Sequence, residues 1–131
     1  MRSMRILRLA AIVAAALTMA PTAQAQGIFG GLKGKKLEAA IQKAEVEPLG
    51  SEKNPVRVNM PGGERNYLAR LRCADGSRPS FERAGSMGIG PFGNILDLYP
   101  VACTGKDAVD VYMDMYHAKD ESRPIPGFTI E

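Results

Sequence analysis

The alternation of apolar and polar residues is clearest near the C-terminal end of the chain. Across residues 109–116, Val and Met alternate with Asp and Tyr at every second position, which is typical of a strand with one buried face. A helix is the competing interpretation, and it would bring Asp110, Asp114 and His117 onto one face. Because the alternation is unbroken, and because Val and Tyr favour strands, we expect a strand here.

Four other segments carry strand signals: the alternating stretches 56–60 and 66–73, a short stretch at 79–84, and residues 94–103. The last of these is apolar on both faces, which favours a central position in the sheet. Pro61-Gly62-Gly63 predicts a turn after the first strand. The Gly-rich residues 85–93 predict a long irregular loop.

One helix is predicted at residues 35–47, where the apolar residues recur at helical spacing: Leu37, Ala40, Ile41 and Ala44. Pro48 and Gly50 end it. Taken together, the pattern predicts a mainly β fold, with an α+β fold as the alternative. The expected architecture is a small antiparallel sheet of four to five strands with one short N-terminal helix.

The first 25 residues have the layout of a secretory signal peptide. Three arginines precede an apolar run at 9–20, and Ala23-Gln24-Ala25 supplies the small residues of a cleavage site. This run is shorter than the roughly 20 residues that cross a bilayer. We therefore expect cleavage after Ala25 and a periplasmic or secreted protein.

Two parts are expected after the signal peptide: a flexible Gly-rich arm at 26–34 and a single small disulfide-linked domain at 35–131. No second apolar run follows the signal peptide, so no transmembrane segment is expected after cleavage. The first 25 residues hold three of the 17 basic residues and none of the 14 acidic ones, so the remainder carries equal numbers of each. A chain without net positive charge is not expected to bind nucleic acid.

Cys73 and Cys103 are the two cysteines of the chain. An even pair in an exported protein favours a disulfide over two buried free thiols. If the segment around Phe81 returns as a strand, the strands that end at the two cysteines run parallel and finish at the same edge of the sheet. The bond therefore argues for a strand near Phe81.

Residues 88–93 match the G-x-G-x-x-G pattern of dinucleotide-binding loops. In that motif the loop opens a helix, whose N-terminus faces the pyrophosphate. Here Pro91 removes one N–H group, and a predicted strand follows. No cofactor is expected, and the segment is interpreted as a structural or a partner-binding loop. If it binds a partner, Gly88, Gly90 and Phe92 are its candidate residues.

Basic residues concentrate in the first half of the predicted domain. Residues 33–83 contain 11 basic and 7 acidic residues, whereas residues 84–131 contain 3 and 7. Ion pairs between neighbouring strands explain this distribution without a ligand. The alternative is a surface for an anionic envelope component, with Arg70 and Arg72 as the candidate binding residues.

Asp97, Asp110, Asp114 and His117 are the candidate metal ligands or catalytic groups. On a strand, Asp110 and Asp114 share a face but lie about 13 Å apart, so no metal site is expected. On a helix, Asp110, Asp114 and His117 converge, which is the alternative. Nucleophilic catalysis has little support, because the chain has one His and no G-x-S-x-G motif.

The sequence thus predicts a small exported domain that binds an envelope protein or polymer without catalysing a reaction. The alternative is a small hydrolase or metal-binding protein that uses the four residues named above. Their geometry distinguishes the two hypotheses, because a catalytic or metal centre requires the side chains to converge on one point.

Overall fold

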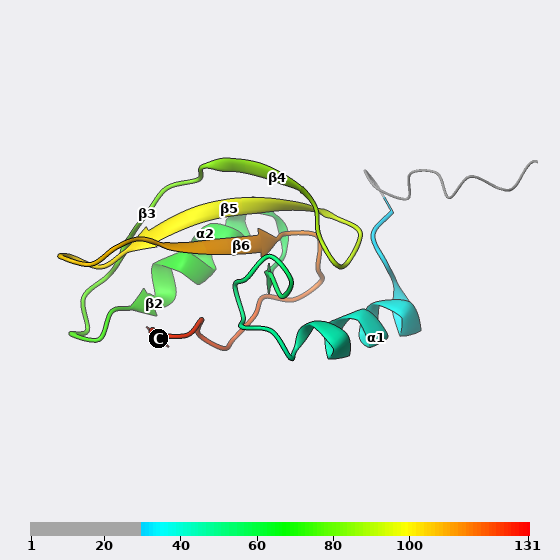
Figure 1. The fold of residues 1–131 in the computed structure, drawn as a ribbon, viewed down its shortest axis with the longest axis horizontal. Coiled ribbons are helices and arrows are strands. Elements are labelled where there is room, and N and C mark those ends of the chain that lie inside the picture. Colours follow the sequence, from blue (N-terminus) through cyan, green and yellow to red (C-terminus); the bar gives the residue numbers. More distant parts are fainter. Residues whose placement is uncertain (1–29) are drawn as a thin grey trace, which may run out of the picture.

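The computed structural model describes residues 30–131. The predicted signal peptide at 1–25 and the first part of the arm, 26–29, lie outside the described residues. The elements follow in the order α1 (Gly34–Ala44), β1 (Val56–Arg57), α2 (Met60–Arg70), β2 (Leu71–Arg72), β3 (Ser80–Phe81), β4 (Gly85–Ile89), β5 (Ile95–Ala102), β6 (Val109–Asp114) and β7 (Thr129–Ile130). Figure 1 shows a curled sheet with α1 at one end of the molecule.

The main sheet has five strands in the order β1-β6-β5-β3, with β4 also paired to β5. The hairpin of β5 and β6 forms its centre, and its register runs from Asp97 opposite Met113 to Val101 opposite Val109. A separate two-stranded sheet joins β2 and β7. The fold is mainly β, as predicted, and both strand predictions at the centre of the sheet are confirmed.

The prediction of an antiparallel sheet is wrong, because β1 pairs with β6 in parallel. That prediction assumed that residues 56–60 and 66–73 form consecutive strands. The second segment is largely helical, so β1 has no neighbouring strand in sequence with which to make a hairpin. It lies instead beside β6, which comes much later in the chain, and the sheet is mixed.

The predicted turn at 61–63 and the strand at 66–73 are replaced by α2 and the short β2. Four buried residues recur at helical spacing across this segment: Glu64, Tyr67, Leu68 and Leu71. Pro61 lies in the first turn, where a missing N–H costs no helical hydrogen bond. Gly63 is buried against Val58, and an ideal Cβ there would lie 2.6 Å from Asp120 Oδ1, so glycine permits the close approach of the helix.

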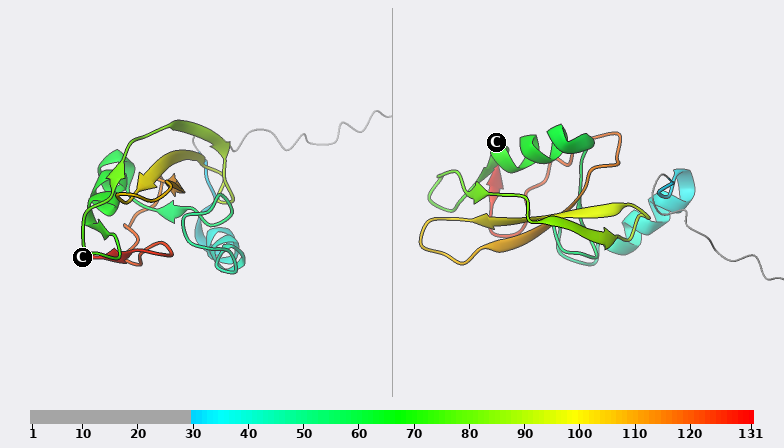
Figure 2. Two further views of the ribbon diagram at one scale, coloured as in Figure 1. Left: turned by 60° about the vertical axis from the view of Figure 1, so that its left-hand side comes forward. Right: turned by 90° about the horizontal axis from the view of Figure 1, so that it is seen from above.

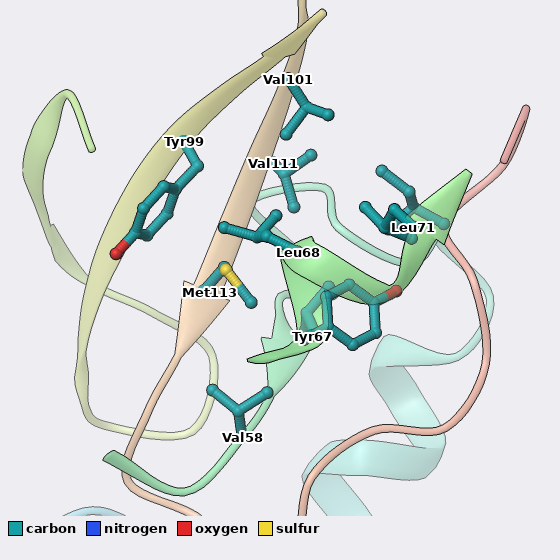
Figure 3. Close-up of a cluster of buried hydrophobic side chains, with 10 residues drawn as sticks. Val58, Tyr67, Leu68, Leu71, Tyr99, Val101, Val111 and Met113 are labelled. Atoms are coloured by element: carbon teal, nitrogen blue, oxygen red, sulfur yellow. The ribbon is translucent and has the colours of Figure 1, made fainter. Parts of the chain in front are cut away.

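Helix α2 covers one face of the sheet (Figure 2, right). The core between them is formed by ten buried residues: Val56, Val58, Tyr67, Leu68, Leu71, Tyr99, Val101, Val111, Met113 and Ile125. Figure 3 shows Leu68 of α2 beside Val111 and Met113 of β6, with Tyr99 of β5 on one side of it and Tyr67 of α2 on the other. Burying this apolar surface is the dominant favourable contribution to folding.

Strand β5 is central, as predicted, although it contains Pro100. The Leu98 carbonyl accepts a hydrogen bond of 2.8 Å from the Ala84 N–H, on the side of β3 and β4. Backbone groups two residues apart point to the same side of a strand, so the Pro100 nitrogen also faces that side. On that side, the pairing of β5 with β3 ends at Phe81 and its pairing with β4 begins at Gly85. Because Pro100 lies opposite this gap, its lack of an N–H leaves no carbonyl of a neighbouring strand unpaired.

The predicted irregular loop at 85–93 is instead the strand β4 followed by a tight turn. The register against β5 shifts between Ser86 and Ile89, and Gly88 takes a φ of +79° in this bulge. In the turn, the Gly90 N–H donates to the Asn94 carbonyl at 2.7 Å, and Gly93 has a φ of +81°. The glycines therefore shape a hairpin between β4 and β5.

The predicted helix near the N-terminus is confirmed as α1, and the predicted short strand near Phe81 is confirmed as β3. The predicted disulfide between Cys73 and Cys103 is also present, with their Cα atoms 6.0 Å apart. The bond joins the segment after β2 to the end of β5, and both cysteines lie directly after a strand. The expected parallel arrangement of these two strands in one sheet is wrong, because β2 pairs with β7 in the separate two-stranded sheet. At the other end of the domain, the Leu32 N–H donates to the Phe92 carbonyl at 2.8 Å and ties residues 30–33 to the turn after β4.

Candidate functional site

Phe92, a candidate binding residue of the Gly-rich segment, is fully buried. Its ring makes an edge-to-face contact with His117, with centroids 5.4 Å apart. The Arg57 guanidinium lies over the same ring, 5.3 Å from its centroid, which is a cation–π geometry. Phe92 therefore anchors the turn to the body of the domain and presents no surface to a partner.

The two candidate glycines have structural roles as well. Gly88 supplies the positive φ of the bulge in β4. Gly90 lies against Leu96, whose side chain would be 2.5 Å from a Cβ at this position. The G-x-G-x-x-G spacing therefore belongs to a β-hairpin, and α2 and α1 both lie elsewhere in the chain. No described helix starts at this motif, in contrast to a dinucleotide-binding loop.

Asp114 and His117 lie in contact at the end of β6. Asp114 is fully buried, and its carboxylate accepts hydrogen bonds from the Asn94 side-chain amide at 3.0 and 3.2 Å and from the Tyr116 N–H at 3.0 Å. The His117 Nε2 atom lies 3.1 Å from Asp114 Oδ2, but it makes no hydrogen bond of good geometry. His117 also lines a shallow hollow of about 360 Å³ together with Arg57 and Ser122.

The other two candidate catalytic residues do not join this pair. Asp97 lies opposite Met113 in the hairpin, so it faces the side of the sheet away from Asp114. Asp110 is exposed and lies opposite Pro100. Among residues 30–131, no three His, Cys, Asp or Glu side chains gather as a potential metal site. The structure thus brings together two of the four residues that the hydrolase or metal-binding hypothesis requires.

A four-residue ion cluster joins α1 to β1 and to the C-terminal segment. Arg57 contacts Glu45 at 2.9 Å and Glu121 at 3.6 Å. Arg123 contacts the same two carboxylates at 2.8 and 2.9 Å. The hydrogen bond from Arg123 is the main cause that lowers the pKa of Glu45. The sequence gives no signal for this cluster, because its members come from three separate segments.

Glu64 and Asp97 form a second group of carboxylates, between α2 and β5. Arg83 holds Asp97 by two hydrogen bonds of 2.9 Å. Glu64 is fully buried, and neither of its carboxyl oxygens makes a hydrogen bond of good geometry with a described residue. Burial, and secondarily the charge of Asp97, raises the pKa of Glu64 to about 7, against the opposing influence of Tyr99.

The candidate binding residues Arg70 and Arg72 line a polar hollow of about 510 Å³ near the end of α2. Arg78 lines it too, together with Asn66, Tyr67, Ala69 and Asp120. We call this feature the arginine hollow. The three arginines come from neighbouring parts of the chain, Arg70 from the end of α2, Arg72 from β2 and Arg78 from the loop that follows.

Strand β4 forms an edge of the main sheet, and no described strand pairs with its outer side. Its side chains are exposed, with 44% of Met87 and 55% of Ile89 accessible to solvent. Figure 1 shows β4 along the upper rim of the sheet, away from α1 over most of its length. Its end, however, adjoins a hollow of about 770 Å³ between α1 and the turn after β4, which we call the α1 groove.

The α1 groove has an apolar wall and a charged rim. Its apolar residues are Ala40, Ala44, Val46, Ile89 and Pro91. Val46 is the most exposed large hydrophobic residue of the described chain, with 84% of its surface accessible. Two lysines and two glutamates complete the lining: Lys43, Lys53, Glu47 and Glu52. The rim therefore has no formal net charge.

Neither of the described helices is long and apolar enough to cross a membrane. Comparison of the chain with models of protein families, with curated proteins and with solved structures finds no match.

Proposed function

We propose that this protein is an exported, non-enzymatic binding domain that takes up an extended segment of another bacterial envelope protein along β4. The single observation that carries the proposal is the open edge of β4 beside the α1 groove. An edge strand presents unpaired backbone N–H and C=O groups, and an added strand is the occupant that satisfies them in series.

The exposed side chains favour an apolar segment. Met87 and Ile89 leave apolar surface in water beside the unpaired backbone, and Ile89 also belongs to the wall of the α1 groove. The rim of this groove carries equal numbers of positive and negative residues. An uncharged apolar side chain of the added strand therefore fits the groove better than a charged one does.

The bulge in β4 limits the length of the added strand. Between Ser86 and Ile89 the register shifts, and a bulge bends the edge and interrupts regular pairing. Natural proteins use such bends to avoid open-ended association of sheet edges. The proposed interaction thus spans a short peptide and does not extend the sheet indefinitely.

The geometry gives little support to the rival hydrolase. Asp97 and Asp114 face opposite sides of the sheet, and Asp110 lies along β6 from Asp114. The remaining Asp114–His117 contact lacks a well-formed hydrogen bond, whereas a catalytic histidine is normally oriented by one. We therefore keep the non-enzymatic function as the proposal.

Export through the signal peptide is part of the proposal. The disulfide is consistent with an oxidising compartment. N-terminal sequencing of the protein recovered from the periplasm is expected to begin at Gln26. Recovery of a chain that still begins at Met1 would contradict cleavage.

The binding proposal is tested with a displayed library of random 12-residue peptides as the probe. Enriched peptides are expected to carry apolar residues at alternate positions and to slow hydrogen exchange in β4. A double variant, Met87→Lys with Ile89→Lys, places two charges on the edge and is expected to lose peptide binding.

Val109→Lys is the matched control, because Val109 is a strand residue of similar exposure, 45%, on β6. It is expected to bind the peptides as the unmodified protein does. Failure of the library to enrich any peptide, or equal binding by the double variant and the control, would overturn the proposal. Thermal unfolding of each variant checks that the domain remains folded.

A further inference from the structure

The arginine hollow concentrates positive charge at one place on a chain with no overall charge after its first 25 residues. Arg70 and Arg78 are exposed, whereas the Arg72 side chain is largely buried, with 11% of its surface accessible. Like charges in one hollow repel one another unless anions compensate them. The positive charge of the arginine hollow therefore has to be compensated by carboxylates of the chain or by a bound anion.

Two carboxylates lie close to the arginine hollow, but they compensate it incompletely. Asp120 accepts a hydrogen bond of 2.8 Å from the Asn59 N–H at the start of α2. Glu131 contacts Arg72, with its Oε2 atom 2.9 Å from the guanidinium. Arg78 makes no ion pair with any residue between 30 and 131. Of the three arginines, only Arg72 forms an ion pair with a carboxylate side chain of the described residues. Arg70, like Arg78, has no such partner there.

The contact of Glu131 shows which ligand chemistry the hollow accepts. Its side-chain carboxylate lies on Arg72, and its main-chain carbonyl accepts a hydrogen bond from Arg70 Nε. The Glu131 side chain remains 70% exposed, so this carboxylate is held only at the rim. An ion pair with such an exposed partner contributes little free energy, and an incoming anion can displace it.

We propose that the arginine hollow is a binding site for an anionic group, a carboxylate or a phosphate, of an envelope polymer, and that Glu131 occupies part of this site. The guanidinium group matches both anions, because its N–H donors bind two oxygens at once. This site is separate from β4, so the inference does not rest on the proposed peptide binding.

The experiment titrates poly-L-glutamate and, in a parallel arm, tripolyphosphate into the protein at low salt, with calorimetry and NMR as readouts. Binding of either probe is expected to shift the amide signals of Asn66, Arg70 and Arg78. The probe that binds more tightly identifies the carboxylate or the phosphate as the natural group. Raising the salt concentration is expected to weaken binding, since screening acts on exposed charges.

Three variants test the assignment. Arg78→Gln is expected to weaken binding about tenfold, the usual effect of removing one charge-assisted hydrogen bond. Glu131→Gln removes the resident carboxylate and is expected to tighten binding. Arg65→Gln is the matched control, since Arg65 is an exposed residue of α2 outside the lining of the hollow.

The proposal is overturned if neither probe binds, or if the signal changes lie away from the hollow. Equal weakening by Arg65→Gln and Arg78→Gln would also overturn it, because it would show a response to total charge alone. A Glu131→Gln variant that binds no more tightly contradicts the role given to that residue. Arg78 is exposed and forms no ion pair with the described chain, so its replacement is not expected to prevent folding.

Discussion

Glu64 on α2 lies buried beside Asp97 on β5, and only one of the two carboxyl groups has a cation to stabilise its charge. Arg83 binds Asp97 through both of its carboxylate oxygens. Glu64 receives no comparable hydrogen bond. The surroundings therefore favour the protonated form of Glu64, and burial raises its pKa to about 7.

This arrangement predicts that the domain loses stability as the pH rises from about 4.5 to about 7. In this range the unfolded chain releases the Glu64 proton and the native state retains it, so the native state binds more protons. The stabilising contribution is complete below pH 4.5 and is lost as the pH rises through 7. The loss amounts to about 3 kcal/mol, measurable by urea unfolding at a series of pH values.

Glu64→Gln is expected to reduce this pH dependence, because the amide does not titrate. Glu38→Gln, at an exposed position of α1, serves as the control and is expected to leave the pH dependence intact. An unchanged dependence in Glu64→Gln would show that Glu64 ionises normally in the native state.

The disulfide is expected to stabilise the domain by about 2–4 kcal/mol, because it closes a 30-residue loop in the unfolded chain. The double variant Cys73→Ala with Cys103→Ala should show this loss in urea unfolding. Thiol labelling of the unmodified protein without reductant is expected to find no free thiol. Quantitative labelling of both cysteines would contradict the bond.

The two faces of β6 are expected to respond differently to substitution. Val111 is fully buried in the core, so Val111→Asp places an unpaired charge there and should cost about 4 kcal/mol or more. Asp110 is exposed, and Asp110→Val should change the stability by less than about 0.5 kcal/mol. Chemical denaturation of both variants measures the contrast, and equal effects would be incompatible with this register.

Phe92 is expected to stabilise the turn after β4 by packing rather than by binding a partner. Phe92→Ala leaves a cavity between His117 and Arg57 and should cost about 3–5 kcal/mol. Pro91→Ala, at the exposed neighbouring position, is the control and should cost far less. If Phe92→Ala retains full stability, the ring does not pack as described.

The sequence predicts those strands whose pattern of apolar and polar residues fits only one type of secondary structure. Residues 109–116 alternate without a break, and 94–103 is apolar on both faces, so β6 and β5 are both identified. The sequence does not predict α2, because the apolar residues of this segment fit both the two-residue repeat of a strand and the 3.6-residue repeat of a helix. Tyr67, Ala69 and Leu71 alternate as in a strand, whereas Tyr67, Leu68 and Leu71 also follow the spacing of a helix. Glu64 completes this helical face, but a charged residue is expected in solvent when only its type is considered.

The candidate sites were less predictable, because their geometry depends on pairing between distant segments. Asp114 and Asp97 fall on opposite faces only once the register of β5 and β6 is known. The contact of Arg57 with Glu121 depends on how the C-terminal segment returns to β1. Phe92 in a Gly-rich stretch looks like an exposed loop residue, and nothing local indicates that the turn folds back over His117.

The parallel pairing of β1 with β6 has a consequence for the time at which the domain can form. Val56 needs Met113 as its neighbour, so the first strand cannot take its place until nearly the whole chain is available. Such non-local pairing slows folding, because a long loop must close before the contact is made. A chain that emerges from the ribosome N-terminus first therefore stays open until its last third appears. The main sheet can therefore close only after β6, at Val109–Asp114, is available.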